Sequence, residues 1–412
     1  MSCITLRRVT TARFFMDHAA TSPLRQVAKD AIMDSWDLLN PGGQYASGRD
    51  ARKAVEEARE TIARLLGAEP IEVIFTASGT EADNLAVQGL YAERAHESED
   101  TQEPGRGHRT ASSHRVIVGS VEHPAVLEPA KALGADPSSP GPKADVIEVP
   151  VDASGHYRTD FLADVLADGP AALMALQWAN NETGALQPVD AVASLAAEHD
   201  VPWHADAVQA VGHVPVNFHS SGATTIAASA HKFGGPRSTG LLLCGRATNL
   251  HKILRGGGQE RSIRPGTLNV AGAVGTAAAL TEACYEMETE RARISRLRDR
   301  LLSFISREIP DSLIHTAEPA LPGHVHVSFP GAEGDSLIML LDQAGFDAST
   351  GSACAAGVNR VSHVVMAIGV EPVAARGTLR FTLGRTTSDN DVAAVEAVLS
   401  KIVEQARAAG MA

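Results

Sequence analysis

The sequence has 412 residues, a length that fits two domains or one large and one small domain. Hydrophobic residues make up 44% of the chain and charged residues 21%, so the chain can bury a core without disulfide or metal support. The 36 Lys and Arg against 49 Asp and Glu give a net charge of −13 at pH 7. This acidity argues against nucleic acid or an anionic membrane as the main partner.

The cysteines and the N-terminus indicate a reducing compartment. The four cysteines lie far apart in the sequence and form no CxxC pair, so neither a disulfide framework nor a metal site is expected. The N-terminal residues include arginines but no apolar stretch long enough for a signal peptide, and the longest apolar run, near 270–280, is too short to cross a bilayer. We therefore expect a cytoplasmic protein with no membrane partner.

In chain order, the pattern from about residue 24 to 245 alternates helices with short apolar strands. Alternation of this kind predicts an α/β fold with a largely parallel sheet that is covered on both faces. The second predicted helix should end at Gly67, a typical C-cap residue. The predicted helices include 24–39, 49–66 and 80–91, and the predicted strands are 71–76, 115–119, 146–149, 171–178, 201–205, 225–228 and 240–244.

The remainder of the chain predicts a smaller α+β unit. A long helical pattern covers about 270–307, and a strand, a helix, a second strand and a final helix follow it. Two polar segments, 96–113 and 134–144, are rich in Pro, Gly or charge and are expected to be mobile surface loops.

Lys232 is the first candidate for chemistry. It lies in ASAHKFGGP (228–236), where a strand of small residues enters a glycine turn. Its stem would pack against apolar groups with the amine at the sheet edge, which suits a Schiff-base lysine whose amine needs a lowered pKa. Taken alone, a solvated surface lysine beside a turn is the simpler interpretation.

Asp206 directly follows a predicted strand, in HADAVQ. A carboxylate at the C-terminal end of a strand points into the crevice where α/β sheets bind ligands. Pyridoxal phosphate (PLP) needs one such acid to keep its ring nitrogen protonated, and Gln209 could donate to the ring hydroxyl oxygen. The alternative is that Asp206 caps the next helix; His204 is expected to be a packing residue.

The segment 76–84, TASGTEADN, predicts a strand, a turn of small residues and a helix start. Free backbone N–H groups and the helix dipole make such a terminus an anion site, to which Thr80 adds a hydroxyl. The spacing matches neither common nucleotide-binding motif. Simple N-capping by Ser78 or Thr80 is the competing interpretation.

Cys354 lies in STGSACAAG (349–357), a run of small residues. Without bulky neighbours the segment should be flexible and exposed, which suits a nucleophilic thiol that must reach its target and leave again. A buried structural cysteine is the alternative.

These motifs occur in one fixed order, and with several others they resemble the NifS-like cysteine desulfurases. This family belongs to the class V aminotransferase superfamily of fold type I PLP enzymes. The matching segments are FMDHAATSP (15–23), TASGTEADNLAVQG (76–89), VEHPAVL (121–127), WANNETG (178–184), HADAVQAVG (204–212), SAHKFGGP (229–236), GGGQERSIRPGT (256–267), STGSAC (349–354) and LRFTLGR (379–385).

The resemblance implies a large PLP-binding domain at 15–265 with a mostly parallel seven-stranded sheet. It also implies a small C-terminal domain at 266–412, with residues 1–14 packed on it. The implied reaction converts L-cysteine to L-alanine and leaves the sulfur on Cys354 as a persulfide, for iron–sulfur cluster assembly or thiolation through an acceptor protein. The alternatives are a selenocysteine lyase, an aminotransferase or a non-catalytic scaffold of the same fold.

The resemblance also assigns roles to residues. Lys232 should carry the cofactor, Asp206 should pair with its ring nitrogen and Gln209 with its phenolic oxygen, and His123 should stack on the ring and assist proton transfer. The phosphate should be held by Gly79, Thr80, Ser229, His231 and, across a homodimer interface, Thr267.

For the substrate, the resemblance implies that Asn181 and Arg380 bind the α-carboxylate and that Cys354 attacks the sulfur. The chain departs from the family pattern at Gly42, Gly43, Tyr45 and Pro265, which bears on dimer and loop contacts.

Overall fold

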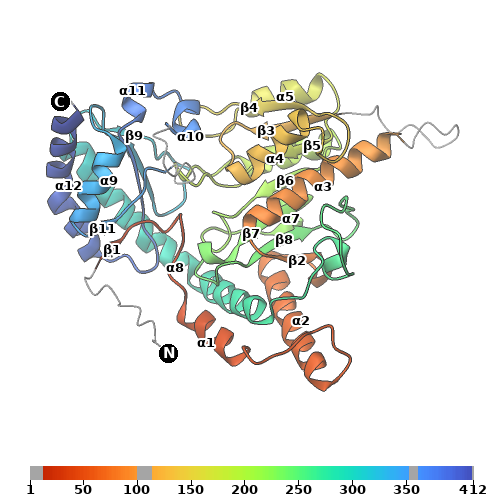
Figure 1. Ribbon diagram of the computed structural model, residues 1–412. Helices are drawn as coiled ribbons and strands as arrows, with labels where there is room; N and C mark the ends of the chain where they lie inside the picture. Colours follow the sequence, from red (N-terminus) through yellow and green to blue (C-terminus); the bar gives the residue numbers. More distant parts are fainter. Residues whose placement is uncertain (1–12, 100–113, 352–360, 411–412) are drawn as a thin grey trace, which may run out of the picture.

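The computed structural model describes residues 13–99, 114–351 and 361–410. A seven-stranded sheet with the order β2-β8-β7-β6-β5-β3-β4 forms the centre of the larger part of the molecule (Figure 1). Strand β8 alone runs in the direction opposite to the other six strands, which confirms the mostly parallel α/β fold. The strands are β2 (Val73–Thr76), β3 (Arg115–Gly119), β4 (Asp145–Val149), β5 (Leu173–Ala175), β6 (Trp203–Asp206), β7 (Thr225–Ser229) and β8 (Gly240–Cys244).

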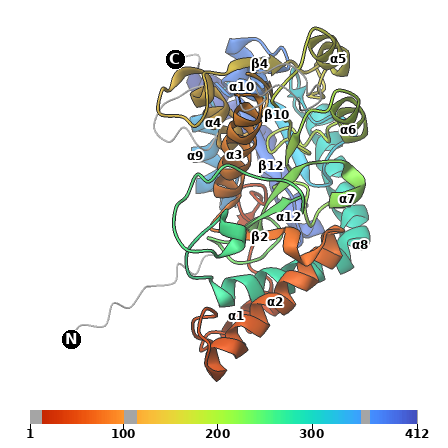
Figure 2. The same cartoon turned by 90° about the vertical axis from the view of Figure 1, so that its right-hand side faces the viewer.

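Helices cover both faces of this sheet because successive side chains of each strand point to opposite sides. In β8, Leu241 and Leu243 pack in one layer, whereas Leu242 and Cys244 pack in the other. Figure 2 shows α3 and α4 on one side of the strands and α5, α6 and α7 on the other. The helices of this part are α1 (Gln26–Asp34), α2 (Ala46–Leu66), α3 (Gly79–Glu99), α4 (Pro124–Ala135), α5 (Thr159–Ala167), α6 (Val189–Glu198) and α7 (Phe218–Ser221).

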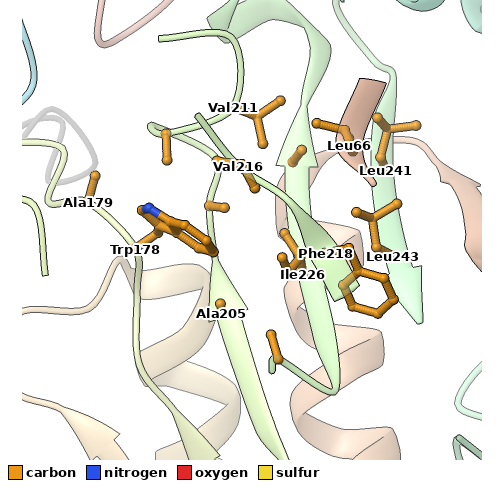
Figure 3. Close-up of a cluster of buried hydrophobic side chains, with 14 of the residues drawn as sticks. Leu66, Trp178, Ala179, Ala205, Val211, Val216, Phe218, Ile226, Leu241 and Leu243 are labelled. Carbon is orange, nitrogen blue, oxygen red and sulfur yellow. The ribbon is translucent and has the colours of Figure 1, made fainter. Parts of the chain in front are cut away.

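The larger of the two layers is a continuous apolar core. Trp178, Ile226 and Leu243 of the sheet region meet Phe218 of α7 and Leu66 at the end of α2 (Figure 3). Burial of large side chains of this kind contributes roughly 1.5–3 kcal/mol each. This packed core holds the strands of the sheet in place. The loops at the carboxyl edge of the sheet are therefore held in defined positions.

Helix α8 (Val270–Glu308) joins the two parts of the molecule. It has 39 residues and is therefore about 58 Å long. Its first half buries Ala273 and Leu280 against the large core, and its second half buries Leu297 and Leu301 in the core of the smaller part (Figure 1). Since α8 contributes to both cores, the boundary between residues 265 and 266 stays a prediction.

The smaller part combines an antiparallel sheet of order β12-β10-β9 with the parallel pair β1-β11. The stacked rings of Phe14 and Phe346 hold β1 against β11, with centroids 4.7 Å apart. Residues 1–12, which we expected to pack here, lie outside the described residues. The remaining elements are β1 (Phe14–Phe15), β9 (Leu313–Ile314), β10 (His324–Ser328), β11 (Phe346–Asp347), β12 (Thr378–Thr382), α9 (Gly334–Gln343), α10 (His363–Ala367), α11 (Pro372–Ala375) and α12 (Asp389–Gly410).

Some predicted bounds differ from the structure. The helix predicted to reach residue 39 ends at Asp34, because the Ser35 hydroxyl donates to the Ala31 and Ile32 carbonyls. Helix α3 continues through residues 96–99 of the first predicted loop, whose residues 100–113 lie outside the described ranges. Most of the second predicted loop has no helix or strand, and it is tied down where Tyr91 donates to the Pro142 carbonyl (2.7 Å).

Candidate active site

A cavity of about 670 Å³ lies at the edge of the sheet where the parallel strands end. Strands β3, β5, β6 and β7 share this edge, so the residues that follow them converge there. Ten of the twelve predicted site residues line the cavity, and they are Gly79, Thr80, His123, Asn181, Asp206, Gln209, Ser229, His231, Lys232 and Arg380.

Lys232 reaches the cavity from the short helix η3 (Ala230–Lys232), directly after β7. Its amine is half-buried and donates to the carbonyls of Ala19 (2.6 Å) and Ala20 (3.1 Å). The Ala19 carbonyl also accepts from the Gln209 side-chain amide (2.9 Å). The lysine is therefore not a solvated surface group, and its amine lies beside the side chain predicted to contact the cofactor ring.

Asp206 ends β6 and is 7% exposed. Burial raises the pKa of its carboxyl to about 6, although the hydrogen bond from the Val208 N–H (2.9 Å) and the Lys232 charge act in the opposite direction. A turn rather than a helix follows, so the carboxylate does not serve as a helix cap. A buried acid of this kind favours a cationic partner in the cavity.

His123 is the N-cap of α4, where its Nδ1 accepts from the Ala125 N–H (3.1 Å). This contact places the proton of the neutral ring on Nε2. Burial first, and then the charges of Lys232 and His363, lower the pKa of His123 to about 4. The imidazole is therefore neutral at pH 7.

His204 is fully buried behind the cavity, as expected of a packing residue. Its two ring nitrogens lie 3.1 Å from an Asp83 oxygen and 2.9 Å from the Thr225 hydroxyl. Its contacts are thus polar rather than purely apolar.

The start of α3 supplies the predicted anion site. Ser78 caps this helix by accepting from the Glu81 N–H (3.0 Å), which leaves the Thr80 side chain exposed on the cavity wall. A Cβ on Gly79 would lie 2.7 Å from a Val208 methyl carbon, so only glycine lets the helix start approach the loop after β6. Ser229 and His231 line the same cavity.

Arg380 of β12 closes the cavity from the smaller part and is 2% exposed. Its Nη1 donates to the Asn181 carbonyl (2.8 Å), and its Nη2 pairs with an Asp17 oxygen (2.7 Å). Its Nε is buried and has no hydrogen-bond partner among the described residues. Because a guanidinium carries five N–H donors, this side chain can bind a further carboxylate.

Two predicted residues are not placed in this cavity. Thr267 lines a second cavity of about 500 Å³, together with Arg52, Arg59 and Glu260. Cys354 lies outside the described residues.

The cavity is also lined by polar residues to which sequence reasoning gave no role: Asp83, Glu128, Gln177, Glu182, Ser362 and His363. Glu182 directly follows the Asn180–Asn181 pair in a matching motif, so its position was visible in the sequence. Burial raises the pKa of Asp83 and of Glu182. Ser362 and His363 had no such signal, since only the folded chain brings them beside strand ends that are far away in sequence.

Within residues 13–99, 114–351 and 361–410, no group of three or more His, Cys, Asp or Glu side chains is arranged to hold a metal ion. None of the helices in these ranges is long and apolar enough to span a membrane.

The residues at the cavity fit PLP. A half-buried amine, a buried carboxyl that ionises below neutral pH and a neutral imidazole suit a protonated pyridine aldehyde, and they come from Lys232, Asp206 and His123. The start of α3 offers N–H groups and the Thr80 hydroxyl for a phosphate.

The chain is similar to known proteins along most of its length. The family model described as aminotransferase class-V matches residues 14–395. An IscS-like cysteine desulfurase of Mycobacterium tuberculosis is 42% identical over 97% of this chain and 98% of its own. A solved NifS-like protein (29% identity, TM-score 0.81) covers 96% of this chain and 99% of its own. A structure described as SspA in complex with cysteine (27% identity, TM-score 0.74) covers 90% and 99%.

Proposed function

The chain belongs to the class V aminotransferase family, and we propose that it is a PLP-dependent cysteine desulfurase. The enzyme would convert L-cysteine to L-alanine and receive the sulfur on Cys354. The observation that carries the proposal is the convergence of Lys232, Asp206 and His123 on one cavity, in a chain similar along nearly its full length to cysteine desulfurases. A cavity in an α/β fold without these three residues would not distinguish this activity from many others.

Lys232 would hold the cofactor covalently, with Asp206 beside its ring nitrogen, Gln209 beside its phenolic oxygen and His123 against its face. When bound, PLP supplies an electron sink that stabilises negative charge at the substrate α-carbon. The phosphate would lie at the start of α3, beside Thr80. The burial that raises the pKa of Asp206 also excludes water from the ring nitrogen.

The substrate carboxylate would bind to Arg380, whose Nε has no partner among the described residues, and to Asn181. Once substrate has displaced it, the Lys232 amine would remove the α-proton. His123, with its proton on Nε2 at neutral pH, would exchange a proton with the substrate thiol.

The sulfur step would use the Cys354 thiolate, since the thiolate is the nucleophile. Its sulfur forms an S–S bond to the substrate sulfur while the substrate C–S bond breaks. The electron pair of that bond passes to the carbon, which takes up a proton and becomes the methyl group of alanine. The balance is one Cys354 thiol and one cysteine to one Cys354 persulfide and one alanine.

A homodimer would complete the site, with Thr267 reaching the phosphate of the partner subunit. Large apolar side chains are exposed on and after α1, among them Met33, Trp36 and Leu39, which supports an interface there. The neighbouring residues Asn40–Gly42 line the same cavity as Thr267. The sulfur-acceptor protein, the use of sulfur in iron–sulfur assembly or thiolation, and the cytoplasmic location stay predictions.

The decisive comparison is between the wild type and Cys354→Ser, both given L-cysteine and dithiothreitol. Wild type should release alanine and sulfide in equal amounts. The variant should keep the visible absorbance of bound PLP, because Lys232 is intact, and lose about 100-fold or more of its sulfide release, because the nucleophile that takes the sulfur is gone. Full sulfide release by the variant would exclude the role of Cys354 and favour the lyase alternative.

A further inference from the structure

Glu182 is a buried carboxylate that the proposed reaction does not use. It is 3% exposed and lies in a turn held by the Asn180 side chain, whose oxygen accepts from the N–H groups of Glu182 and Thr183 (both 2.9 Å). The Asn180 amide donates to the Val121 carbonyl (3.0 Å), just beyond β3. Glu182 is therefore fixed to the large sheet although it faces the smaller part of the molecule.

One oxygen of Glu182 lies beside two segments that flank Cys354 in the sequence. The Ser362 hydroxyl donates to Oε2 (2.6 Å) and also accepts from the Val364 N–H (3.1 Å), so it ties the start of α10 to Glu182. On the other side, a Cβ on Gly351 would lie 3.0 Å from the same oxygen. Gly351 also has φ +90°, which side chains rarely allow.

His326 of β10 completes the surroundings of this carboxylate. It is fully buried, and its Nε2 lies 4.0 Å from Oε2 of Glu182 and 3.4 Å from the Cβ position of Gly351. Neither ring nitrogen has a hydrogen-bond partner among the described residues. A side chain at position 351 would therefore meet polar groups on two sides, so only glycine lets the backbone approach Glu182 this closely.

On the basis of the proposed function, we propose that Glu182 is a positioning residue for the sulfur-transfer step. Its hydrogen bond to Ser362 and the close approach of Gly351 to the same oxygen set where the segment that carries Cys354 begins and ends. Glu182 takes no part in the chemistry at the substrate α-carbon. Its contribution is geometric, and a 1 Å misplacement of a reacting group costs on the order of 100-fold in rate.

The test separates the two half-reactions in the holoenzyme. Hydrogen exchange at the α-carbon of L-alanine in D₂O reports the Lys232 step without sulfur, and mass spectrometry of Cys354 after one turnover with L-cysteine reports sulfur transfer. Glu182→Ala and Ser362→Ala should slow persulfide formation about tenfold or more and change α-hydrogen exchange less than about twofold.

Conservative variants separate positioning from acid–base chemistry. Glu182→Gln keeps an oxygen that can accept from Ser362, and Ser362→Thr keeps the hydroxyl, so both should stay within about threefold of wild type. Ser194→Ala removes an exposed hydroxyl bonded within α6 and serves as the matched control. If Glu182→Ala does not fold, Ser362→Ala still tests the contact, because it leaves the carboxylate in place.

Three outcomes would overturn the inference alone: persulfide formation in both alanine variants within about threefold of wild type, an equal loss of α-hydrogen exchange, or a Glu182→Gln variant as impaired as Glu182→Ala. A wild type that exchanges the α-hydrogen but forms no persulfide would overturn the proposed function and the inference together.

Discussion

At the scale of single residues, burial sets the protonation of the cavity. It lowers the pKa of His123 and of His231 to about 4 and raises that of Asp206 to about 6. At neutral pH both imidazoles are therefore uncharged and can donate or accept hydrogen bonds without competing with Lys232 for an anion.

Gly79 offers a residue-scale prediction. In Gly79→Ala the new Cβ would lie 2.7 Å from a Val208 methyl carbon, well inside the roughly 3.5–4.0 Å of a normal contact, so the start of α3 must shift. We expect the dissociation constant for PLP to rise about tenfold, measured by titrating the apoprotein and following visible absorbance. Val208→Ala in the same chain should restore much of the affinity. Unchanged binding in Gly79→Ala, or no recovery in the double variant, would contradict this explanation.

Lys232, Asp206 and the start of α3 could be predicted from the sequence because each follows a strand end, and strand ends meet at one edge; the family resemblance supplied the other site residues. The partners of those residues could not be predicted. The pairing of Arg380 with Asp17 joins residues 363 positions apart, and no local pattern signals it. The same holds for the contact of Ser362 with Glu182.

At the scale of elements, the loop after β8 is held in an unfavourable backbone conformation by its side chains. Glu260, Arg261 and Ser262 all have φ between 46° and 59°, which is rare for residues with a Cβ. The Glu260 carboxylate accepts from Arg59 (2.9 and 2.7 Å) and from the Phe75 N–H (2.7 Å). These contacts fix the loop that leads to Thr267.

Glu260→Ala should therefore lower the free energy of unfolding by up to about 3–5 kcal/mol, since it removes the buried partner of Arg59 and leaves only the half-exposed Glu56 carboxylate beside that charge. Urea denaturation measures this loss. The matched control is Lys53→Ala, which removes an exposed pair with Glu57 (3.7 Å) and should cost at most about 0.5 kcal/mol. Equal losses in the two variants would show that the buried pair does not stabilise the loop.

Elements with strong local signals could be predicted closely. Strands 115–119 and 240–244 have the expected bounds, and helix α2 ends before Gly67, which has φ +62°. The two-residue strands β1, β9 and β11 could not be predicted, because so short a segment carries no periodicity and forms only where tertiary contacts place it.

At the scale of the whole molecule, the interior contains many uncharged histidines. Burial is the main cause of a lowered pKa in His18, His123, His204, His213, His231, His315, His324 and His326. Burial raises the pKa of four acids, Asp83, Glu122, Glu182 and Asp206. The two sets affect stability in opposite directions, and the histidines are more numerous.

These shifts predict acid lability. Below about pH 6.5 the unfolded chain protonates histidines that stay neutral in the folded protein down to about pH 4, so unfolding takes up protons and stability falls as pH falls. The acids offset part of this, because the folded state protonates them at higher pH. From pH 6.5 to 4.5 we expect a loss of at least about 1.4 kcal/mol per pH unit, the value for one net proton.

Thermal unfolding followed by circular dichroism at pH 7.0, 6.0 and 5.0 measures this loss. The same series in high salt is the control, because salt screens exposed ion pairs but hardly affects buried groups. A melting temperature that stays constant or rises toward pH 5 would contradict the prediction.

The central claim is that Lys232 holds the cofactor covalently. Borohydride reduction of the purified protein, followed by peptide mass spectrometry, tests it most directly, because reduction makes the bond between lysine and cofactor permanent. We predict a single modified peptide with PLP on Lys232, and a Lys232→Ala variant that carries none. Cofactor on another lysine, or no covalently bound cofactor in the wild type, would contradict the account.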